Sequence, residues 1–278
     1  MTTELVEYQG NCHCGAFKFS FKAPKVTEAG PCDCSICARN DYLWTKPTEF
    51  TVTKGDENTT LTQYTFGSGN FTHKFCPTCG TSVMTRAGPA IGGGFVIVNL
   101  RCVQGIDFPS LKIKDHFKGS AHGAPYQPPE PVPVESVPEG ATVYHGNCRC
   151  GAVAFTLVSK EKITEANECN CSICWRDGAL WTYPPTKDIT FRGLESATEY
   201  TFAAKLTYHG FCKICGVSVF ERFVGSEPPV RSRPEYQGKD RNNFTALNVR
   251  TFNGFNLGEL KLEKTDGLSE LPLYEVPE

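Results

Sequence analysis

Hydrophobic and polar residues alternate along short stretches of this chain, which is the pattern of half-buried β-strands. Phenylalanine alternates with polar residues over 17–21, and an apolar residue recurs at every second position of 153–157, 136 positions later. No segment shows a convincing helical period of 3.6 residues. Further strand-like segments are FTVT from Phe50, QYTF from Gln63, TSVMTR from Thr81, FVIVNLR from Phe95 and LKI from Leu111, with the counterparts DITF, EYTF, VSVFER, FTALNVR and LKL in the second half. The pattern predicts an all-β fold.

Cysteine motifs recur in the same order in the two halves. Each half carries a CxC, then a CxCSIC, then a CxxCG motif. The first cysteines of these motifs are Cys12, Cys32 and Cys76 in the first half and Cys148, Cys169 and Cys212 in the second, at offsets of 136, 137 and 136. The chain is therefore an internal duplication, and we expect two tandem domains at 1–124 and 142–278.

A proline-rich segment, 125–141, separates the two copies. It holds six prolines in seventeen residues, a density that keeps a chain extended at about 3.1 Å per residue. We interpret it as a surface linker that is long enough for the two domains to pair within one chain.

The second copy also contains an insertion. The offset between the copies rises from 136 at Arg86 and Arg222 to 149 at Asn99 and Asn248, and the longer loop, GSEPPVRSRPEYQGKD, begins at Gly225. Such a loop either borders a ligand site or is inert surface. Inert surface is the favoured interpretation, because loops tolerate insertions.

Charge and hydropathy exclude several classes of partner. The chain has 28 Lys and Arg against 30 Asp and Glu, a net charge of −2 and a pI near 6.3, so it lacks the basic patch that nucleic-acid binding requires. It shows no secretory signal pattern and no run of about 18 apolar residues that would span a membrane. We expect a soluble protein of the cytoplasm or nucleus, where disulfides rarely persist.

The fifteen cysteines therefore need another explanation. Fourteen of them fall into the clustered motifs, and thiolates one or two residues apart can bind one zinc ion; iron–sulfur ligation is the alternative. The remaining thiol, Cys102, is interpreted as an unpaired, half-buried residue.

Seven thiols per copy divide into four and three. A closed structural zinc takes four ligands, which two separated two-cysteine turns commonly supply, and three thiolates leave one position open, as a catalytic zinc requires. Alternatively His73, His209, Asp33 or another side chain closes the second site. The predicted four-cysteine sets are Cys12, Cys14, Cys76 and Cys79, and Cys148, Cys150, Cys212 and Cys215; the three-cysteine sets are Cys32, Cys34 and Cys37, and Cys169, Cys171 and Cys174. This division predicts two zinc ions per domain and four per chain.

These motifs carry a resemblance to a known family. GNCHCGAFKF, CDCSIC and HKFCPTCG, repeated as GNCRCGAVAF, CNCSIC and HGFCKICG, resemble the glutathione-dependent formaldehyde-activating enzyme family, which includes centromere protein V. The resemblance covers both copies nearly end to end. It implies two zinc-braced β-tent domains, a structural four-cysteine zinc, and a three-cysteine zinc that binds the thiol of glutathione. It also implies carbon–sulfur lyase activity on S-hydroxymethylglutathione or related thiol adducts.

The residues themselves are consistent with that chemistry. An adduct RS–CH(OH)R′ breaks when its sulfur leaves as thiolate while a base takes the hydroxyl proton, and an open zinc position would stabilise the thiolate. Asp33 could be the base, although the second copy has Asn170 there; the alternative is that both residues cap a turn. Arg39 and Arg176 could bind a substrate carboxylate. The alternative is a solvated charge at a strand end or a hydrogen bond to a loop carbonyl.

Other repeated side chains have two interpretations each. Trp44 and Trp181 follow the last cysteine of the three-cysteine motif by seven residues and either wall a pocket or belong to the core, which is commoner for an aromatic residue in a β-rich chain. His73 and His209 are proton carriers or, more simply, satisfied strand histidines.

Three functional classes follow from these observations. The first is a zinc-dependent lyase acting on thiol adducts. The second is a non-catalytic zinc-braced module that binds a protein. The third is a chromatin or cytoskeletal adaptor, which the acidic pI and the lack of a basic extension disfavour.

Overall fold

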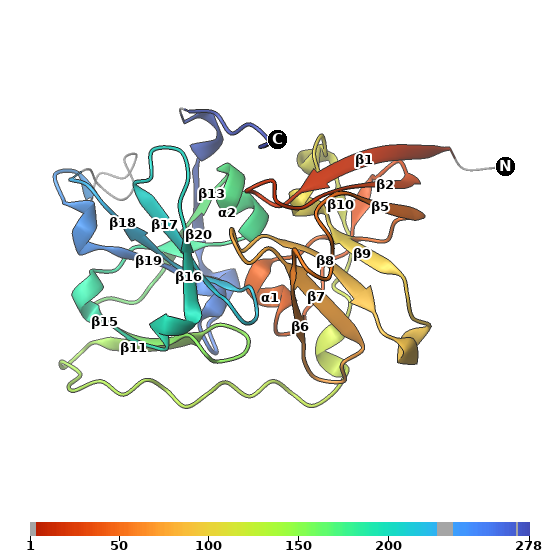
Figure 1. The fold of residues 1–278 in the computed structure, drawn as a ribbon. Helices are drawn as coiled ribbons and strands as arrows, with labels where there is room; N and C mark the ends of the chain where they lie inside the picture. Colours follow the sequence, from red (N-terminus) through yellow and green to blue (C-terminus); the bar gives the residue numbers. More distant parts are fainter. Residues whose placement is uncertain (1–3, 227–235, 271) are drawn as a thin grey trace. The chain divides into compact units, whose positions relative to one another are not determined.

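The computed structural model describes residues 4–226, 236–270 and 272–278, which are built mostly of β-strands (Figure 1). The chain forms two compact units. The first comprises Met1–Tyr126, Arg176–Gly178 and Glu275–Glu278, and the second comprises Gln127–Trp175 and Ala179–Tyr274. The predicted all-β class is confirmed. Among the described residues, no helix is long and apolar enough to cross a membrane.

The first unit contains three sheets. A three-stranded antiparallel sheet has the order β1-β2-β5, a five-stranded sheet has the order β4-β9-β8-β7-β6, and β3 pairs in parallel with β10. The strands are β1 (Leu5–Asn11), β2 (Lys18–Pro24), β3 (Glu28–Ala29), β4 (Trp44–Thr45), β5 (Glu49–Lys54), β6 (Thr62–Thr65), β7 (Phe71–Phe75), β8 (Ser82–Ala87), β9 (Val96–Asn99) and β10 (Lys112–Ile113).

The second unit has the same sheets, except that two of them are joined into one. Its three-stranded sheet is β11-β12-β15, and a seven-stranded sheet has the order β16-β17-β18-β19-β14-β13-β20. The parallel pair β13 and β20 corresponds to β3 and β10, and it joins the larger sheet through β14. The strands are β11 (Thr142–Asn147), β12 (Ala154–Ser159), β13 (Glu165–Cys169), β14 (Trp181–Thr182), β15 (Ile189–Arg192), β16 (Ala197–Tyr200), β17 (Thr207–Cys212), β18 (Ser218–Phe223), β19 (Thr245–Asn248) and β20 (Lys261–Thr265).

The alternating residues form the core, as predicted. Phe17, Phe19 and Phe21 are at most 2% exposed, and their counterparts in the second copy are at most 1% exposed. Successive side chains of a strand point to opposite faces, and in the first copy the intervening Lys18 and Ser20 are only partly buried. In the second copy the intervening Ala154 and Thr156 are buried too, so this strand is buried on both faces rather than half-buried as predicted. Cys102 is fully buried rather than half-buried as predicted: its Sγ lies 3.0 Å from the carbonyl oxygen of Asn99, and burial raises its pKa to about 12.

Two short helices were not predicted. They are α1 (Cys37–Asn40) and α2 (Ser172–Asp177), of four and six residues. Elements of one to two turns are too short to show a helical period. Each begins within a CxCSIC motif and continues beyond its last cysteine. Short 3₁₀ turns connect many of the strands.

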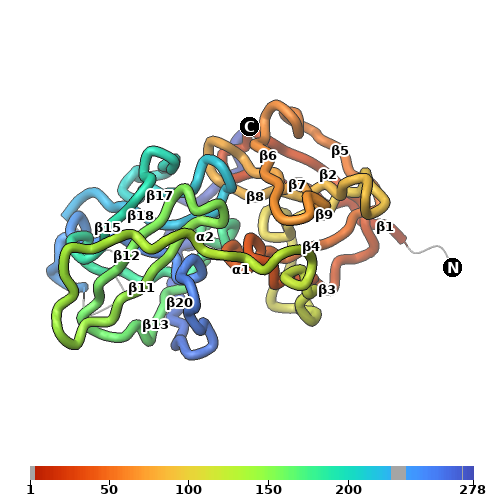
Figure 2. The backbone as a smooth tube through the Cα atoms, turned by 90° about the horizontal axis from the view of Figure 1, so that it is seen from below, coloured from red at the N-terminus to blue at the C-terminus, as the bar shows by residue number. Residues whose placement is uncertain are grey.

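Part of the proline-rich segment packs on the second unit instead of crossing solvent. Val132 is 5% exposed, and its carbonyl oxygen accepts a hydrogen bond of 2.6 Å from the Thr156 hydroxyl of β12. Arg192 donates to the Glu130 carbonyl oxygen at 3.0 Å. In Figure 2 this segment runs beside β11 and β12. The extended backbone that proline favours thus supplies an apolar side chain to the core.

Candidate metal centres and the cavity of the second unit

Each unit brings its predicted four-cysteine set together. In the first unit, Cys12 and Cys14 follow β1, while Cys76 and Cys79 lie in the turn between β7 and β8. The four ligand atoms lie within 4.8 Å of one another, with Sγ separations of 3.7 Å for Cys12–Cys14 and 3.6 Å for Cys14–Cys76. Four thiolates at about 2.3 Å from one zinc are roughly 3.8 Å apart in a tetrahedron. The cluster is therefore compatible with zinc.

The second unit repeats the arrangement with Cys148, Cys150, Cys212 and Cys215. The Sγ separations are 3.5 Å for Cys148–Cys150 and for Cys150–Cys212. Three of the four thiols are at most 1% exposed. This burial is expected of a structural metal site that links two turns.

Two features of the local backbone orient these cysteines toward one another. The β7–β8 ladder shifts register between Lys74 and Phe75, directly before Cys76, and the β17–β18 ladder does so in the corresponding place. Such a bulge bends the strand. The glycines that end the motifs have positive φ, 72° at Gly15 and 75° at Gly80, which glycine adopts without strain. The Phe17 amide then donates to Cys12 Sγ at 3.3 Å.

The three-cysteine sets also assemble. Cys32, Cys34 and Cys37 have ligand atoms within 4.8 Å of one another, and the Sγ atoms of Cys34 and Cys37 are 3.3 Å apart. Cys169, Cys171 and Cys174 form the same group in the second unit. Thiol hydrogen bonds, principally from Cys32, lower the pKa of Cys34, and those from Cys171 lower the pKa of Cys169. Each cluster thus favours one thiolate, which is the form that binds metal.

The two tryptophans contact these clusters directly. Trp44 Nε1 donates to Cys37 Sγ and Trp181 Nε1 donates to Cys174 Sγ, both at 3.4 Å. Trp181 is fully buried and also lines the cavity described below. Trp181 therefore belongs to the core and also forms part of the cavity wall, the two roles that the sequence left open.

A glycine touches each three-cysteine cluster, and sequence reasoning missed it. A Cβ atom added to Gly119 would lie 2.5 Å from Cys32 Sγ, and one added to Gly267 would lie 2.8 Å from Cys169 Sγ. Both glycines follow the strand that pairs in parallel with β3 or β13. Only residues without a side chain allow this backbone to approach the thiols.

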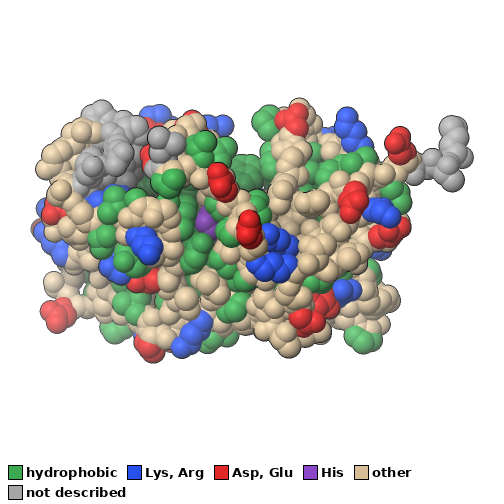
Figure 3. All heavy atoms as spheres, turned by 45° about the horizontal axis from the view of Figure 1, so that its top comes forward, with side chains coloured by type: hydrophobic (Ala, Val, Ile, Leu, Met, Phe, Trp, Pro, Cys, Tyr) green, Lys and Arg blue, Asp and Glu red, His purple; other side chains and the backbone are tan. Residues whose placement is uncertain are grey.

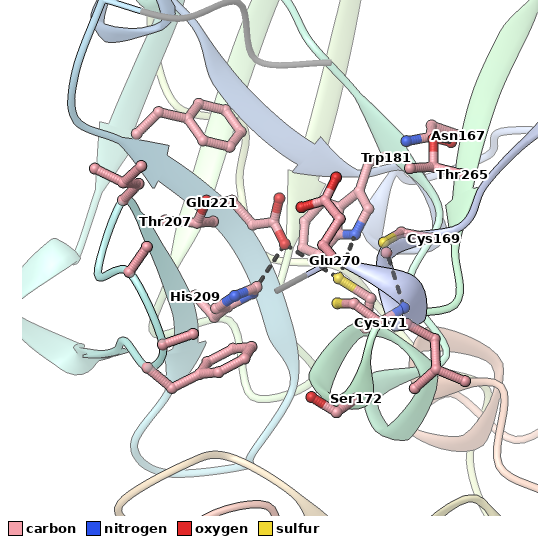
Figure 4. A pocket seen from close by; sticks show the side chains of 18 of the residues that line it. Asn167, Cys169, Cys171, Ser172, Trp181, Thr207, His209, Glu221, Thr265 and Glu270 are labelled. Carbon is pink, nitrogen blue, oxygen red and sulfur yellow. Dashed lines mark hydrogen bonds and ion pairs between the residues drawn. The ribbon is translucent and has the colours of Figure 1, made fainter. Parts of the chain in front are cut away.

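The second unit contains a cavity of about 660 Å³ that opens onto its three-cysteine cluster (Figure 4). All three thiols line it. Aromatic walls are provided by Trp181, Tyr183 and Phe202, and cationic side chains by Lys205, Arg241 and Lys264. Acidic side chains line it as well, namely Glu221, Asp266 and Glu270. The lining is therefore partly aromatic and carries charges of both signs.

A buried carboxylate and imidazole stand beside Cys174 in this cavity. Glu221 and His209 are each 5% exposed. Glu221 Oε1 lies 2.8 Å from His209 Nδ1 and 3.3 Å from Cys174 Sγ, and Figure 4 shows Glu221 reaching between the histidine and the sulfur atoms. The corresponding residues of the first copy are His73 and Thr85. Burial lowers the pKa of His73 to about 4.

The predicted base Asp33 is held in a turn. Its two carboxylate oxygens accept hydrogen bonds of 2.8 Å from the backbone amide and the hydroxyl of Ser120, and the amide bond lowers its pKa. Asn170 makes the equivalent connection, with its side-chain oxygen accepting from the Leu268 amide at 2.9 Å and its amide donating to Asp266. This geometry is compatible with the turn cap that the sequence offered as the alternative, and a catalytic role for Asp33 stays a prediction.

The predicted arginines are buried. Arg39 is 7% exposed, donates to the Ser35 carbonyl oxygen at 2.8 Å and lies 4.6 Å from the centre of the Tyr126 ring. Arg176 is 8% exposed and is not among the described residues that line the cavity. Arg101 donates to the carbonyl oxygen of Asp41 at 2.7 Å. A substrate contact for Arg39 and Arg176 stays a prediction.

Glu221 and Arg241 are among the cavity residues that the sequence reasoning missed. Glu221 lies in the strand segment VSVFER, where a charged residue occupies an inward position that holds Thr85 in the first copy; this difference between the copies was the available signal. Arg241 directly follows the inserted loop. Residues 227–235 of that loop lie outside the described residues, but its Tyr236 packs on Tyr183, with ring centres 5.8 Å apart. The end of the insertion therefore borders the cavity.

The chain is similar to known proteins in its sequence. The family model of the glutathione-dependent formaldehyde-activating enzyme matches residues 7–117 and 143–232. A solved structure described as a Rhodobacter sphaeroides protein is 27% identical over 44% of this chain and 99% of its own, with a TM-score of 0.35. The family match spans most of both copies and includes the cysteines of all four clusters. The chain belongs to the glutathione-dependent formaldehyde-activating enzyme family.

Proposed function

We propose that the chain is a zinc-dependent carbon–sulfur lyase that cleaves or forms adducts of glutathione or a similar thiol. The observation that carries this proposal is the cavity of the second unit, because three thiols lie together on its lining. Family membership supports the same reaction class. On the face drawn in Figure 3, positive and negative side chains are interspersed, which offers no support for an adaptor that binds nucleic acid.

The reaction breaks one carbon–sulfur bond. In RS–CH(OH)R′ the sulfur leaves with the bonding electron pair, the hydroxyl oxygen gives up its proton, and a C=O bond forms. A bound zinc ion supplies a Lewis acid that keeps the leaving sulfur as thiolate. Cys169, Cys171 and Cys174 are the residues that would hold this ion in the second unit, and Cys32, Cys34 and Cys37 those in the first.

The remaining lining residues bind and orient the adduct. The rings of Trp181, Tyr183 and Phe202 exclude water around the sulfur, which strengthens electrostatic interactions there. Arg241 and Lys264 provide cations for the carboxylates that glutathione carries. Glu221 Oε1 and His209 lie beside the thiols, where polar groups can position the adduct hydroxyl.

The test uses the full chain loaded with zinc. Glutathione binding is measured by calorimetry, and formation and cleavage of S-hydroxymethylglutathione are followed by NMR, in the parent and in Cys171→Ser. We expect the variant to lose binding and turnover in the second copy. Cys34→Ser is the matched variant for the first copy. If the zinc-loaded parent neither binds glutathione nor exchanges the adduct, the chain is a binding module and the lyase proposal fails.

A further inference from the structure

Two cationic residues that line the cavity of the second unit have glycine counterparts in the first copy. They are Lys205 and Arg241, and we call them the cation pair. At the offsets of 136 and 149 that relate the copies on either side of the insertion, the first copy has Gly69 and Gly92 at these positions. The duplication has therefore produced a difference of two positive charges between the corresponding positions.

The turn that carries Lys205 is held in an unusual backbone conformation. Ala203 and Lys205 have φ values of 49° and 56°, and Gly67 and Gly69 have 58° and 70° at the corresponding positions of the first copy. The second copy thus keeps the turn without its glycines. Residues with a Cβ atom have fewer backbone conformations than glycine, so the exchange restricts the turn and fixes the position of Lys205 on the cavity.

Arg241 is fixed by packing. Its side chain is 8% exposed, and its guanidinium carbon lies 5.2 Å from the centre of the Phe223 ring. Phe223 belongs to the same buried cluster as Cys174. A guanidinium stacked on a buried ring loses little freedom when it binds a carboxylate, which favours binding.

The two cations lie at one end of the cavity. A Cβ atom added to Gly225 would lie 3.8 Å from Arg241 Cδ and 3.8 Å from Leu206 Cδ2. Leu206 directly follows Lys205, and its carbonyl oxygen accepts a hydrogen bond of 2.9 Å from the Val224 amide. The segments that carry the cation pair are therefore joined at this point.

Two of the three acidic side chains of the lining have other partners. Asp266 accepts hydrogen bonds from the Asn170 amide at 2.8 Å and the Ser269 hydroxyl at 2.6 Å. Glu221 Oε1 lies 2.8 Å from His209 Nδ1. These carboxylates are thus held by residues outside the cation pair.

We propose that Lys205 and Arg241 form an anion subsite, which makes the second copy selective for thiol adducts that carry a carboxylate. The first copy, with glycine at both positions, does not select for this charge. A cavity of about 660 Å³ is in the size range of small-molecule sites. The inference rests on the proposed function for the nature of the ligand, and it gives one chain two different thiol preferences.

The experiment uses S-methylglutathione and its diethyl ester with the full, zinc-loaded chain. The ester keeps the peptide skeleton but lacks both negative charges, and neither probe has a thiol. Binding is followed by NMR at the indole of Trp181, which lines the cavity, and at that of Trp44 in the first copy. At Trp181 we expect the acid to bind at least about 10-fold more tightly than the ester. At Trp44 we expect the two affinities to agree within about 3-fold.

Substitutions assign the selectivity to the cation pair. We expect Lys205→Gly with Arg241→Gln to reduce the ratio of affinities at Trp181 to less than about 3-fold, and Lys205→Arg to retain it. Lys187→Gln, which changes an exposed lysine outside the described lining of the cavity, is the control and should keep the parental ratio. Folding is checked by circular dichroism. If the double variant does not fold, Lys205→Gly alone should lower the ratio at least about 3-fold, because glycine suits this turn.

Each outcome separates this inference from the lyase proposal. Equal binding of acid and ester at Trp181, or binding of neither, would overturn the anion subsite even in a chain that cleaves the adduct. A parental ratio in the folded variants that lack the cations would also overturn it. A chain without turnover that prefers the acid, and loses this preference with the cation pair, would contradict the proposed function and support the subsite.

Discussion

At the residue scale, Gly119 lies against the thiols of the first copy's three-cysteine cluster. A methyl group at this position would meet Cys32 Sγ at 2.5 Å and Cys34 Cβ at 3.0 Å. We expect Gly119→Ala to displace these cysteines and to reduce the zinc content by one ion per chain, with the fold retained. Metal analysis by mass spectrometry measures the loss.

The control for that variant is Gly30→Ala. A Cβ at Gly30 would have only the Trp44 carbonyl oxygen near it, at an ordinary 3.6 Å. This variant should keep all of its zinc. Full zinc content in Gly119→Ala would show that the backbone can shift away from the cluster at little cost.

Asp33 is the second residue whose role can be decided by one substitution. Both of its oxygens accept hydrogen bonds from Ser120, and Asn170 makes a similar turn in the second copy. We expect Asp33→Asn, in a chain with Cys171→Ser, to change adduct turnover less than about 10-fold. A loss of 100-fold or more, as for a general base, would instead support the catalytic role predicted from the sequence.

At the scale of elements, the four-cysteine clusters link turns that are distant in sequence. Cys12 and Cys14 follow β1, and Cys76 follows β7 about sixty residues later. Structural zinc contributes on the order of 10 kcal/mol or more, which matches the whole stability of a domain. We expect Cys76→Ser to unfold the first copy, measured as loss of its cooperative thermal transition. A parental melting curve with full zinc content would remove Cys76 from the ligand set.

The three-cysteine clusters join elements that are already adjacent. Cys32, Cys34 and Cys37 lie within six residues that lead into α1, so a metal there closes only a short loop. We expect Cys34→Ser to melt within a few degrees of the parent while adduct turnover in the first copy is lost. Collapse of the fold would make this second metal structural and would favour the binding-module interpretation.

For the whole molecule, these two kinds of cluster predict a stepwise loss of metal. The four-cysteine thiols are mostly buried, whereas two of the three thiols in each three-cysteine cluster are partly exposed. We expect a chelator to remove two of four zinc ions rapidly without unfolding and the other two only with unfolding. Zinc release followed together with circular dichroism measures both steps. A single release of all four ions that coincides with unfolding would contradict this order.

The sequence by itself determined the duplication, the β-class and the two kinds of cysteine cluster. It could do so because strand alternation and metal-ligand spacing are local patterns, visible in residues 17–21 and in each CxCSIC motif. The two helices were missed because four to six residues are too few for a period to appear.

Only the tertiary structure decided what lies beside the clusters. Gly267 lies against Cys169, which is 98 residues away in the sequence. Glu221, on β18, contacts Cys174, which is 47 residues away. The turn in which Asp33 is held likewise depends on Ser120, 87 residues later. Contacts of this kind arise from strand pairing between distant segments, which no local pattern encodes. The cavity that surrounds the thiols of the second copy is the product of those contacts.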